Sequence, residues 1–247
     1  MSFEAIYTVW LREMIRYFRQ KERIIGSLVM PLFWLVVFGS SMRPSVDIGN
    51  LDYRTFISPG VIMMTVVFTS VSSGISIIWD KELGFMKEML VAPVSRISIV
   101  LGKSLGTATT ALIQGMLIMF ISMLIGLNVS FYTILLMIPI ILFISLGLVG
   151  IGITLGSLMN NIEGFQLLFN FLVMPLVFLS GALFPINNLP PYLKFIPYID
   201  PVTYGVELLR YILIGYSTIP FYISLAVVLV FSTSMLFIST LAFKRKA

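Results

Sequence analysis

The chain of 247 residues is 58% hydrophobic and 11% charged, with a mean hydropathy of +1.03. Charged residues make up about a quarter of an average soluble domain, so this composition predicts one polytopic membrane domain, residues 1–247, without a separate soluble domain. The absence of cysteine and histidine excludes disulfides, thiolate chemistry and the commonest metal ligand and general base. We therefore expect no catalytic residue, metal site or cofactor in this chain. Membrane lipids account for the net charge of +5, so no nucleic acid partner is expected.

Residues 1–23 are predicted to form an amphipathic helix rather than a signal peptide, because charges persist to Arg23. At 100° per residue, apolar side chains gather on one face and polar side chains on the opposite face. The apolar face holds Phe3, Ile6, Tyr7, Trp10, Met14, Tyr17 and Phe18, and the polar face holds Arg12, Glu13, Arg16, Arg19, Gln20 and Arg23. We expect this helix to lie in the headgroup plane. Trp10, Arg12, Arg16 and Arg19 are its candidate functional residues, either as a simple anchor or in gripping a partner.

Charge-free runs predict an all-α fold with six membrane spans, because a charge at mid-bilayer costs about 2.5–3.5 kcal/mol. The longest run, 104–162, is too long to cross a core about 30 Å thick once at about 1.5 Å per residue. We expect it to turn near residues 126–130. The predicted spans are 24–42, 57–79, 104–126, 131–157, 165–184 and 220–243.

The distribution of Lys and Arg predicts that both termini lie in the cytoplasm. Residues 1–23 carry five, residues 80–103 carry four and the tail carries three, twelve in all, against four on the other side: Arg43, Arg54, Lys194 and Arg210. Cytoplasmic segments carry the excess of positive charge. We therefore expect a multi-pass protein of the plasma or inner membrane.

Small and polar residues inside the predicted spans favour helix packing over substrate contact. Gly152 and Gly156 are spaced for close approach of two helices, within one subunit or between two. The uncharged polar residues are Thr107, Thr109, Thr110, Gln114, Gln166 and Asn170. The sequence identifies no acid within a span, so the substrate-binding residues remain unassigned and a proton-driven carrier is not favoured.

Residues 185–219 are predicted to form an outer re-entrant loop. Five prolines interrupt an apolar stretch rich in aromatic residues, and prolines break helices while aromatics prefer the interface. Irregular backbone at membrane depth needs surrounding protein or a water-filled cavity. A shaped outer gate and an ordinary aromatic-rich loop both fit this pattern.

Residues 80–103 hold seven of the 27 charged side chains between two predicted spans. Gly102-Lys103-Ser104 is not a phosphate-binding P-loop, because Ile97 stands where that loop needs glycine and no strand precedes it. Pro93 is expected to end a short helix at about 80–92, and Ser95 to cap the helix that continues into the third span. A force on this connection would move both spans.

Two regions of the sequence resemble the permease subunits of type-2 ATP-binding-cassette exporters. One is Glu82-x-Gly84-x-x-x-Glu88-x-Leu90-x-x-Pro93-Val94-Ser95-Arg96, followed by Leu101-Gly102-Lys103. The other is Leu179-Ser180-Gly181 through Phe184-Pro185, then Leu189-Pro190, Asp200-Pro201-Val202-Thr203-Tyr204 and Arg210. The chain departs from the family where Phe85 replaces threonine, Lys87 replaces an acid and Asp200 replaces asparagine.

The resemblance implies a half-channel that pairs with a second permease copy or paralogue. A separate cytoplasmic ATPase would bind ATP and magnesium, so this chain would not be the enzyme. The implied coupling residues are Glu82, Gly84, Phe85, Lys87, Glu88, Leu90, Pro93, Ser95 and Arg96. The implied outer-gate residues are Ser180, Gly181, Pro185, Pro190, Pro201, Tyr204 and Arg210. A hydrophobic drug, a lipid or a lipid-linked glycan would fit as substrate. A passive channel or assembly factor and a lipid-modifying enzyme are the alternatives.

Overall fold

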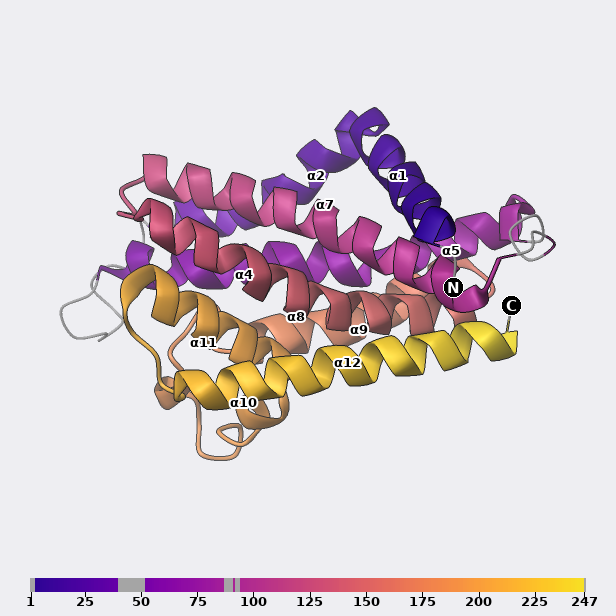
Figure 1. Ribbon diagram of the computed structural model, residues 1–247. Coiled ribbons are helices and arrows are strands. Elements are labelled where there is room, and N and C mark those ends of the chain that lie inside the picture. Colours follow the sequence, from indigo (N-terminus) through magenta and orange to yellow (C-terminus); the bar gives the residue numbers. More distant parts are fainter. Residues whose placement is uncertain (1–2, 40–51, 87–90, 92–93, 247) are drawn as a thin grey trace.

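The computed structural model describes residues 3–39, 52–86, 91 and 94–246, and all secondary-structure elements assigned within these ranges are helices (Figure 1). They are α1 (Phe3–Arg19), α2 (Lys21–Phe33), η1 (Trp34–Phe38), α4 (Tyr53–Val71), α5 (Ser73–Glu82), α7 (Arg96–Leu124), α8 (Phe131–Leu158), α9 (Ile162–Leu179), η2 (Ile186–Asn188), α10 (Ile196–Ile199), α11 (Pro201–Ile214) and α12 (Phe221–Lys246). Both termini lie at the same end of the bundle in Figure 1.

Five helices in the described part of the chain are long and apolar enough to cross a membrane: Tyr53–Glu82, α7, α8, α9 and Phe221–Lys244. They coincide with the second to sixth predicted spans. The first predicted span, 24–42, begins on a shorter apolar helix, Ile24–Phe38, and its last residues lie outside the described ranges. Whether the first predicted span crosses the membrane therefore stays a prediction.

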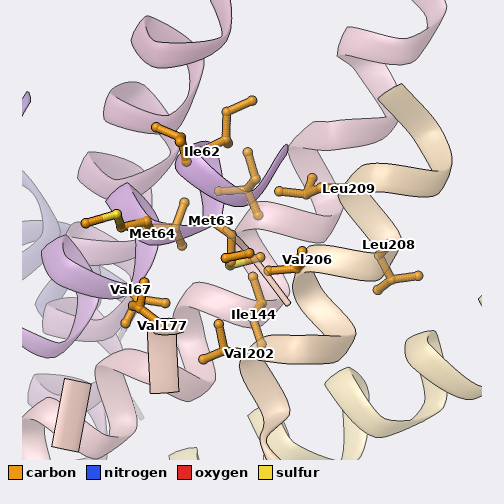
Figure 2. Close-up of a cluster of buried hydrophobic side chains, with 14 of the residues drawn as sticks. Ile62, Met63, Met64, Val67, Ile144, Val177, Val202, Val206, Leu208 and Leu209 are labelled. Atoms are coloured by element: carbon orange, nitrogen blue, oxygen red, sulfur yellow. The ribbon is translucent and has the colours of Figure 1, made fainter. Parts of the chain in front are cut away.

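The centre of the bundle is formed by α4, α7 and α8, with α5, α11 and α12 packed around them. Helix α4 is buried along almost its whole length, which fits a sequence that is apolar on every side. Figure 2 shows this core where Met63 of α4 approaches Ile144 of α8 and Val206 of α11. By contrast, the buried residues of α9 are only Phe165, Val173 and Val177. Helix α9 therefore presents most of its apolar surface outward.

Glycines of α8 bring three helices into backbone contact within this one chain. A Cβ atom at Gly156 would stand 2.4 Å from the carbonyl oxygen of Gly74 in α5, and one at Gly150 would stand 2.8 Å from the backbone of Met235 in α12. Both distances are shorter than real side chains allow. These glycines therefore pack within the subunit, which decides between the two alternatives left open by the sequence.

The connection between α5 and α7 is shorter than the predicted loop 80–103. Helix α5 ends at Glu82 and is followed by a turn at Gly84, which has a φ of +79°, a conformation that glycine adopts at little cost. Helix α7 begins at Arg96 and already contains Lys103. The predicted start of a separate helix at residue 80 is therefore wrong, since Asp80 belongs to the helix that precedes the turn.

Candidate functional site

Helix α1 lies against α7, and two glycines of α7 make this possible. The backbone of Gly102 lies beside Val9, and that of Gly106 lies beside Glu13, so closely that a Cβ atom at either position would stand 2.7 Å from the α1 side chain. Trp10 Nε1 donates a hydrogen bond of 3.1 Å to the Thr109 hydroxyl. Gly102 of the Gly-Lys-Ser motif thus serves helix packing.

Four charged side chains from three helices meet beside this contact: Arg12, Glu13, Asp80 and Lys103. We call them the inner charge cluster, after the side that the sequence predicts to be cytoplasmic. Lys103 Nζ lies 2.5 Å from Asp80 Oδ2 and 3.6 Å from Glu13 Oε1, and Arg12 Nη2 lies 2.8 Å from Asp80 Oδ1. The side chains of Asp80 and Lys103 are almost completely buried. Opposite charges at these distances offset the cost of burial, so the cluster joins α1, α5 and α7.

The cluster bears on two features of the sequence. Arg12 and Glu13, on the polar face of α1, contact buried charges, whereas Phe3 and Phe18, on its apolar face, are exposed. Asp80 and Lys103 were expected in a charged loop, yet both are buried within helices.

Lys81 ties the same end of α5 to the end of α8. Its amino group donates hydrogen bonds to the carbonyl oxygens of Gly156, Ser157 and Met159, at 3.1, 2.7 and 3.2 Å. The last carbonyls of a helix lack intrahelical partners, and a cation is favourable there. Consecutive residues of α5 therefore bond to opposite sides, Asp80 to α1 and α7 and Lys81 to α8.

Only part of the predicted coupling segment falls within the described residues. Ser95 caps α7 as expected, since its hydroxyl accepts from the Ser98 amide at 3.2 Å. Arg96 donates to the Lys244 carbonyl at 2.6 Å. Glu82 and Phe85 are exposed, and the Arg12 guanidinium lies 5.3 Å from the centre of the Phe85 ring. Lys87, Glu88, Leu90 and Pro93 lie outside the described residues.

The opposite end of the bundle, which the sequence predicts to face outward, holds a second charged centre, and we call Glu207 and Arg210 of α11 the outer ion pair. Arg210 Nη1 lies 2.6 Å from Glu207 Oε1, and both side chains are at most 1% exposed. Arg210 Nη2 also donates to the Gly181 carbonyl at 2.7 Å, and its guanidinium stacks 4.1 Å from the centre of the Phe56 ring. Arg210 thus joins α11 to α4 and to the turn after α9.

Glu207 holds the turn that leads from α11 into α12. Its Oε2 accepts hydrogen bonds from the backbone amides of Thr218 and Ile219. Gly215, with a φ of +69°, ends α11 just before this turn. The carboxylate is therefore satisfied by two amides and a guanidinium, which a buried charge requires.

The other predicted outer-gate residues shape the same region without converging on one point. Ser180 is buried and Gly181 adopts a φ of +79° at the turn after α9. Pro201 begins α11, and the Tyr204 hydroxyl donates to the Tyr198 carbonyl at 2.7 Å. Pro185 precedes η2, whereas Pro190 is exposed.

Asp200 caps α11 and is itself buried. Its Oδ1 accepts a hydrogen bond of 2.8 Å from the Val202 amide, as an N-cap residue does. Oδ2 has no hydrogen-bond partner among the described residues. Burial raises the pKa of Asp200 to about 7, and the Val202 hydrogen bond only partly opposes this.

Sequence reasoning missed Glu207 and the burial of Asp80. Glu207 stands three residues before Arg210, a spacing that brings side chains together on a helix, and this signal was available. Asp80 and Lys103 are far apart in the sequence, so their pairing depends on how α5 and α7 pack.

The five long apolar helices of the described chain define a multi-pass helical membrane protein. The chain matches the family described as ABC-2 type transporter over residues 4–214, and it therefore belongs to that family. The resemblance stated from the sequence is confirmed, and the protein is a membrane transport permease of the ABC-2 family.

Three relatives agree with this assignment. The protein ycf38 of Cyanophora paradoxa, named as a transport permease, is 31% identical over 219 residues, which are 85% of this chain and 74% of ycf38. Inner membrane transport permease YadH of Escherichia coli (strain K12) is 26% identical over 236 residues, 92% of this chain and 90% of YadH. Nodulation protein J of Rhizobium leguminosarum bv. trifolii is 23% identical over 242 residues, 96% of this chain and 92% of the relative.

Proposed function

We propose that this permease is the membrane subunit of an ATP-driven exporter. A separate cytoplasmic ATPase would bind ATP and magnesium, and the permease would form the path for a hydrophobic or amphipathic substrate such as a drug, a lipid or a lipid-linked glycan. The termini and the connection between α5 and α7 would then face the cytoplasm, in agreement with the excess of Lys and Arg there.

The observation that carries the proposal is the bonding around the α5–α7 connection. The inner charge cluster joins its two helices to α1, and Lys81 joins α5 to α8. Met86 lies in a buried cluster with Ile99 and Val149, so the connection is also packed onto α7 and α8. A partner that displaced this connection would move four helices together, which is what coupling to an ATPase requires.

A second permease copy is part of the proposal. Apolar side chains on α9 are strongly exposed, with Leu167 at 73% and Phe171 at 81%. Large exposed apolar faces mark contacts with lipid or with another subunit. One chain of this size would provide half of a transport path, and a copy or paralogue would provide the other half.

The test is recovery and activity of the complex from native membranes. We expect an ATPase subunit to co-purify with the permease, and Phe85→Ala to lower substrate-stimulated ATP hydrolysis in proteoliposomes about tenfold, which corresponds to about 1.4 kcal/mol. Tyr192→Ala removes an exposed aromatic side chain from the predicted outer loop and should leave hydrolysis unchanged.

Two outcomes would contradict the proposal at different levels. If the wild-type permease is recovered without a nucleotide-binding subunit, a passive channel or an assembly factor is favoured. If an ATPase is recovered but Phe85→Ala behaves as the wild type, the α5–α7 connection is not where it couples.

A further inference from the structure

A polar chamber lies between α1, the junction of α4 and α5, and α7. Its volume is about 70 Å³, and every side chain that lines it is polar, in a chain that is 58% hydrophobic. A water molecule needs about 10–15 Å³ of such space, so the chamber holds on the order of five water-sized groups. This is comparable to one phosphate group with its oxygens.

The charges around the chamber leave one cation unpaired. Arg12 and Lys103 contact the two carboxylates of the inner charge cluster, Asp80 and Glu13. Arg16 lines the chamber one turn further along α1 and has no ion-pair or hydrogen-bond partner among the described residues. Glu13 is the one carboxylate among the lining side chains, and it already faces Lys103 at 3.6 Å. The charge of Arg16 is therefore left to attract an anion.

Polar side-chain atoms are also left without partners at the chamber wall. The Ser73 hydroxyl and Glu13 Oε1 line it without a hydrogen-bond partner among the described residues, and the Tyr17 hydroxyl lies beside the Gln114 side chain. Ser73 is only 5% exposed. Buried polar groups are normally satisfied, so these unpartnered atoms indicate a bound polar group or water.

The side chain of Gln114, on the α7 side of the chamber, is held in place by two hydrogen bonds. Its amide oxygen accepts from the Thr69 hydroxyl, and its amide nitrogen donates to the Ser27 hydroxyl at 2.8 Å. Ser27 belongs to α2, whose next turns expose Val29, Met30 and Phe33. An apolar surface on which acyl chains can lie thus begins beside the chamber.

We propose that this chamber binds a phosphate ester, the group that a phospholipid headgroup presents. The Arg16 guanidinium would pair with the phosphate oxygens, and the hydroxyls of Tyr17 and Ser73 would donate to them. Guanidinium groups suit phosphate because they offer several donors in one plane. A lipid held here would bridge α1 to the spans, and its acyl chains would lie along α2.

The test compares ligands on the full-length protein purified in detergent. Native mass spectrometry with added phosphatidylglycerol should show about tenfold weaker retention by Arg16→Gln than by the wild type, because the variant loses the charge-assisted hydrogen bonds to the phosphate. Lys194→Gln, at an exposed cation far from the chamber in the sequence, is the control and should retain the lipid fully. Diacylglycerol, which lacks the phosphate, should not be retained.

Two further arms assign the source and guard against misfolding. Glycerol phosphate that raises the Tm of delipidated wild type but not of Arg16→Gln would support the site and assign it to a soluble ligand. If Arg16→Gln does not elute as a folded protein, Tyr17→Phe replaces it and should weaken retention several-fold. Equal phosphatidylglycerol retention by wild type and the folded chamber variant, or retention of diacylglycerol as strong as that of phosphatidylglycerol, would overturn the proposal.

Discussion

The inner charge cluster and the outer ion pair are both buried, yet they hold the bundle by different kinds of bond. The inner cluster joins three helices through side-chain to side-chain contacts, and one member, Arg12, is 36% exposed. The outer pair is at most 1% exposed and bonds mainly to backbone, at Gly181 and at the turn of Thr218 and Ile219.

The two centres differ in the number of ionic partners that each charge has. Asp80 has two cationic partners, so losing one leaves it paired. Arg210 and Glu207 are each other's ionic partners, and removing one leaves a charge deep in protein, which typically costs about 3–5 kcal/mol. The inner end can therefore exchange partners when helices shift, whereas the outer end behaves as a fixed joint.

The largest expected effect is at the outer pair. Arg210→Met should lower the free energy of unfolding by about 3–5 kcal/mol, because Glu207 is left buried without its cation. Thermal unfolding in detergent, followed by tryptophan fluorescence, measures the loss. The double variant Glu207→Gln/Arg210→Met should lose less than the single one, since the neutral amide can still accept from Thr218 and Ile219.

Arg19→Met is the control for this comparison, because Arg19 is exposed and should change stability by less than about 0.5 kcal/mol. An Arg210→Met protein that unfolds like this control would show that the outer pair is not a fixed joint.

An intermediate effect is expected at Asp200, the buried acid near the outer pair. Its folded-state pKa of about 7 lies above its ordinary value of 3.8, so the folded protein holds this proton more tightly than the unfolded chain does. The contribution of protonated Asp200 to the free energy of unfolding is fully present below about pH 4, and it is lost as the pH rises to about 7. Asp200→Asn keeps the cap to Val202 and should remove that decline.

The measurement is the Tm of wild type and Asp200→Asn at intervals between pH 4.5 and 8. The variant should gain stability relative to wild type as pH rises, with the largest gain above pH 7. Glu163→Gln, at an exposed acid in the first turn of α9, is the control for a general charge effect. Parallel pH curves for wild type and Asp200→Asn would contradict the assignment.

The smallest effect is expected at the inner end. Arg12→Gln should cost about 1 kcal/mol or less, since partly exposed ion pairs contribute little and Lys103 still holds Asp80. Lys103→Gln should cost more, because Lys103 is buried and contacts both Asp80 and Glu13. Chemical unfolding of the two variants tests this order, and a larger loss for Arg12→Gln would refute the redundancy of the cluster.

Much of the fold could be predicted from the sequence because bilayer physics is simple. Charge-free runs located the five long apolar helices of the described chain, and Ser95 was identified as the cap of α7 from its place after Pro93. The helix ends were harder. Charge placed the boundary of the second span at residue 79, but a paired Asp80 can be buried, so the helix runs on to Glu82.

The candidate site was predicted less well, for a reason visible in Trp10 and Thr109. Amphipathic periodicity showed that α1 has two faces. It did not show that one side of α1 packs against Gly102 and Gly106 of α7. Partners that are distant in the sequence leave no local pattern. The outer-gate motif did locate Gly181 and Arg210, which the fold brings together.

The seat of α1 on α7 also has a consequence for synthesis. The Trp10–Thr109 bond joins residues 99 positions apart, and at about 5–20 residues per second a ribosome needs about 5–20 s to make the intervening chain. During that interval α7 is not yet available for α1 to pack against, so the aromatic side chains of α1 contact the bilayer instead. The wall of the polar chamber closes only when α7 has been inserted, at a time when lipid already surrounds α1.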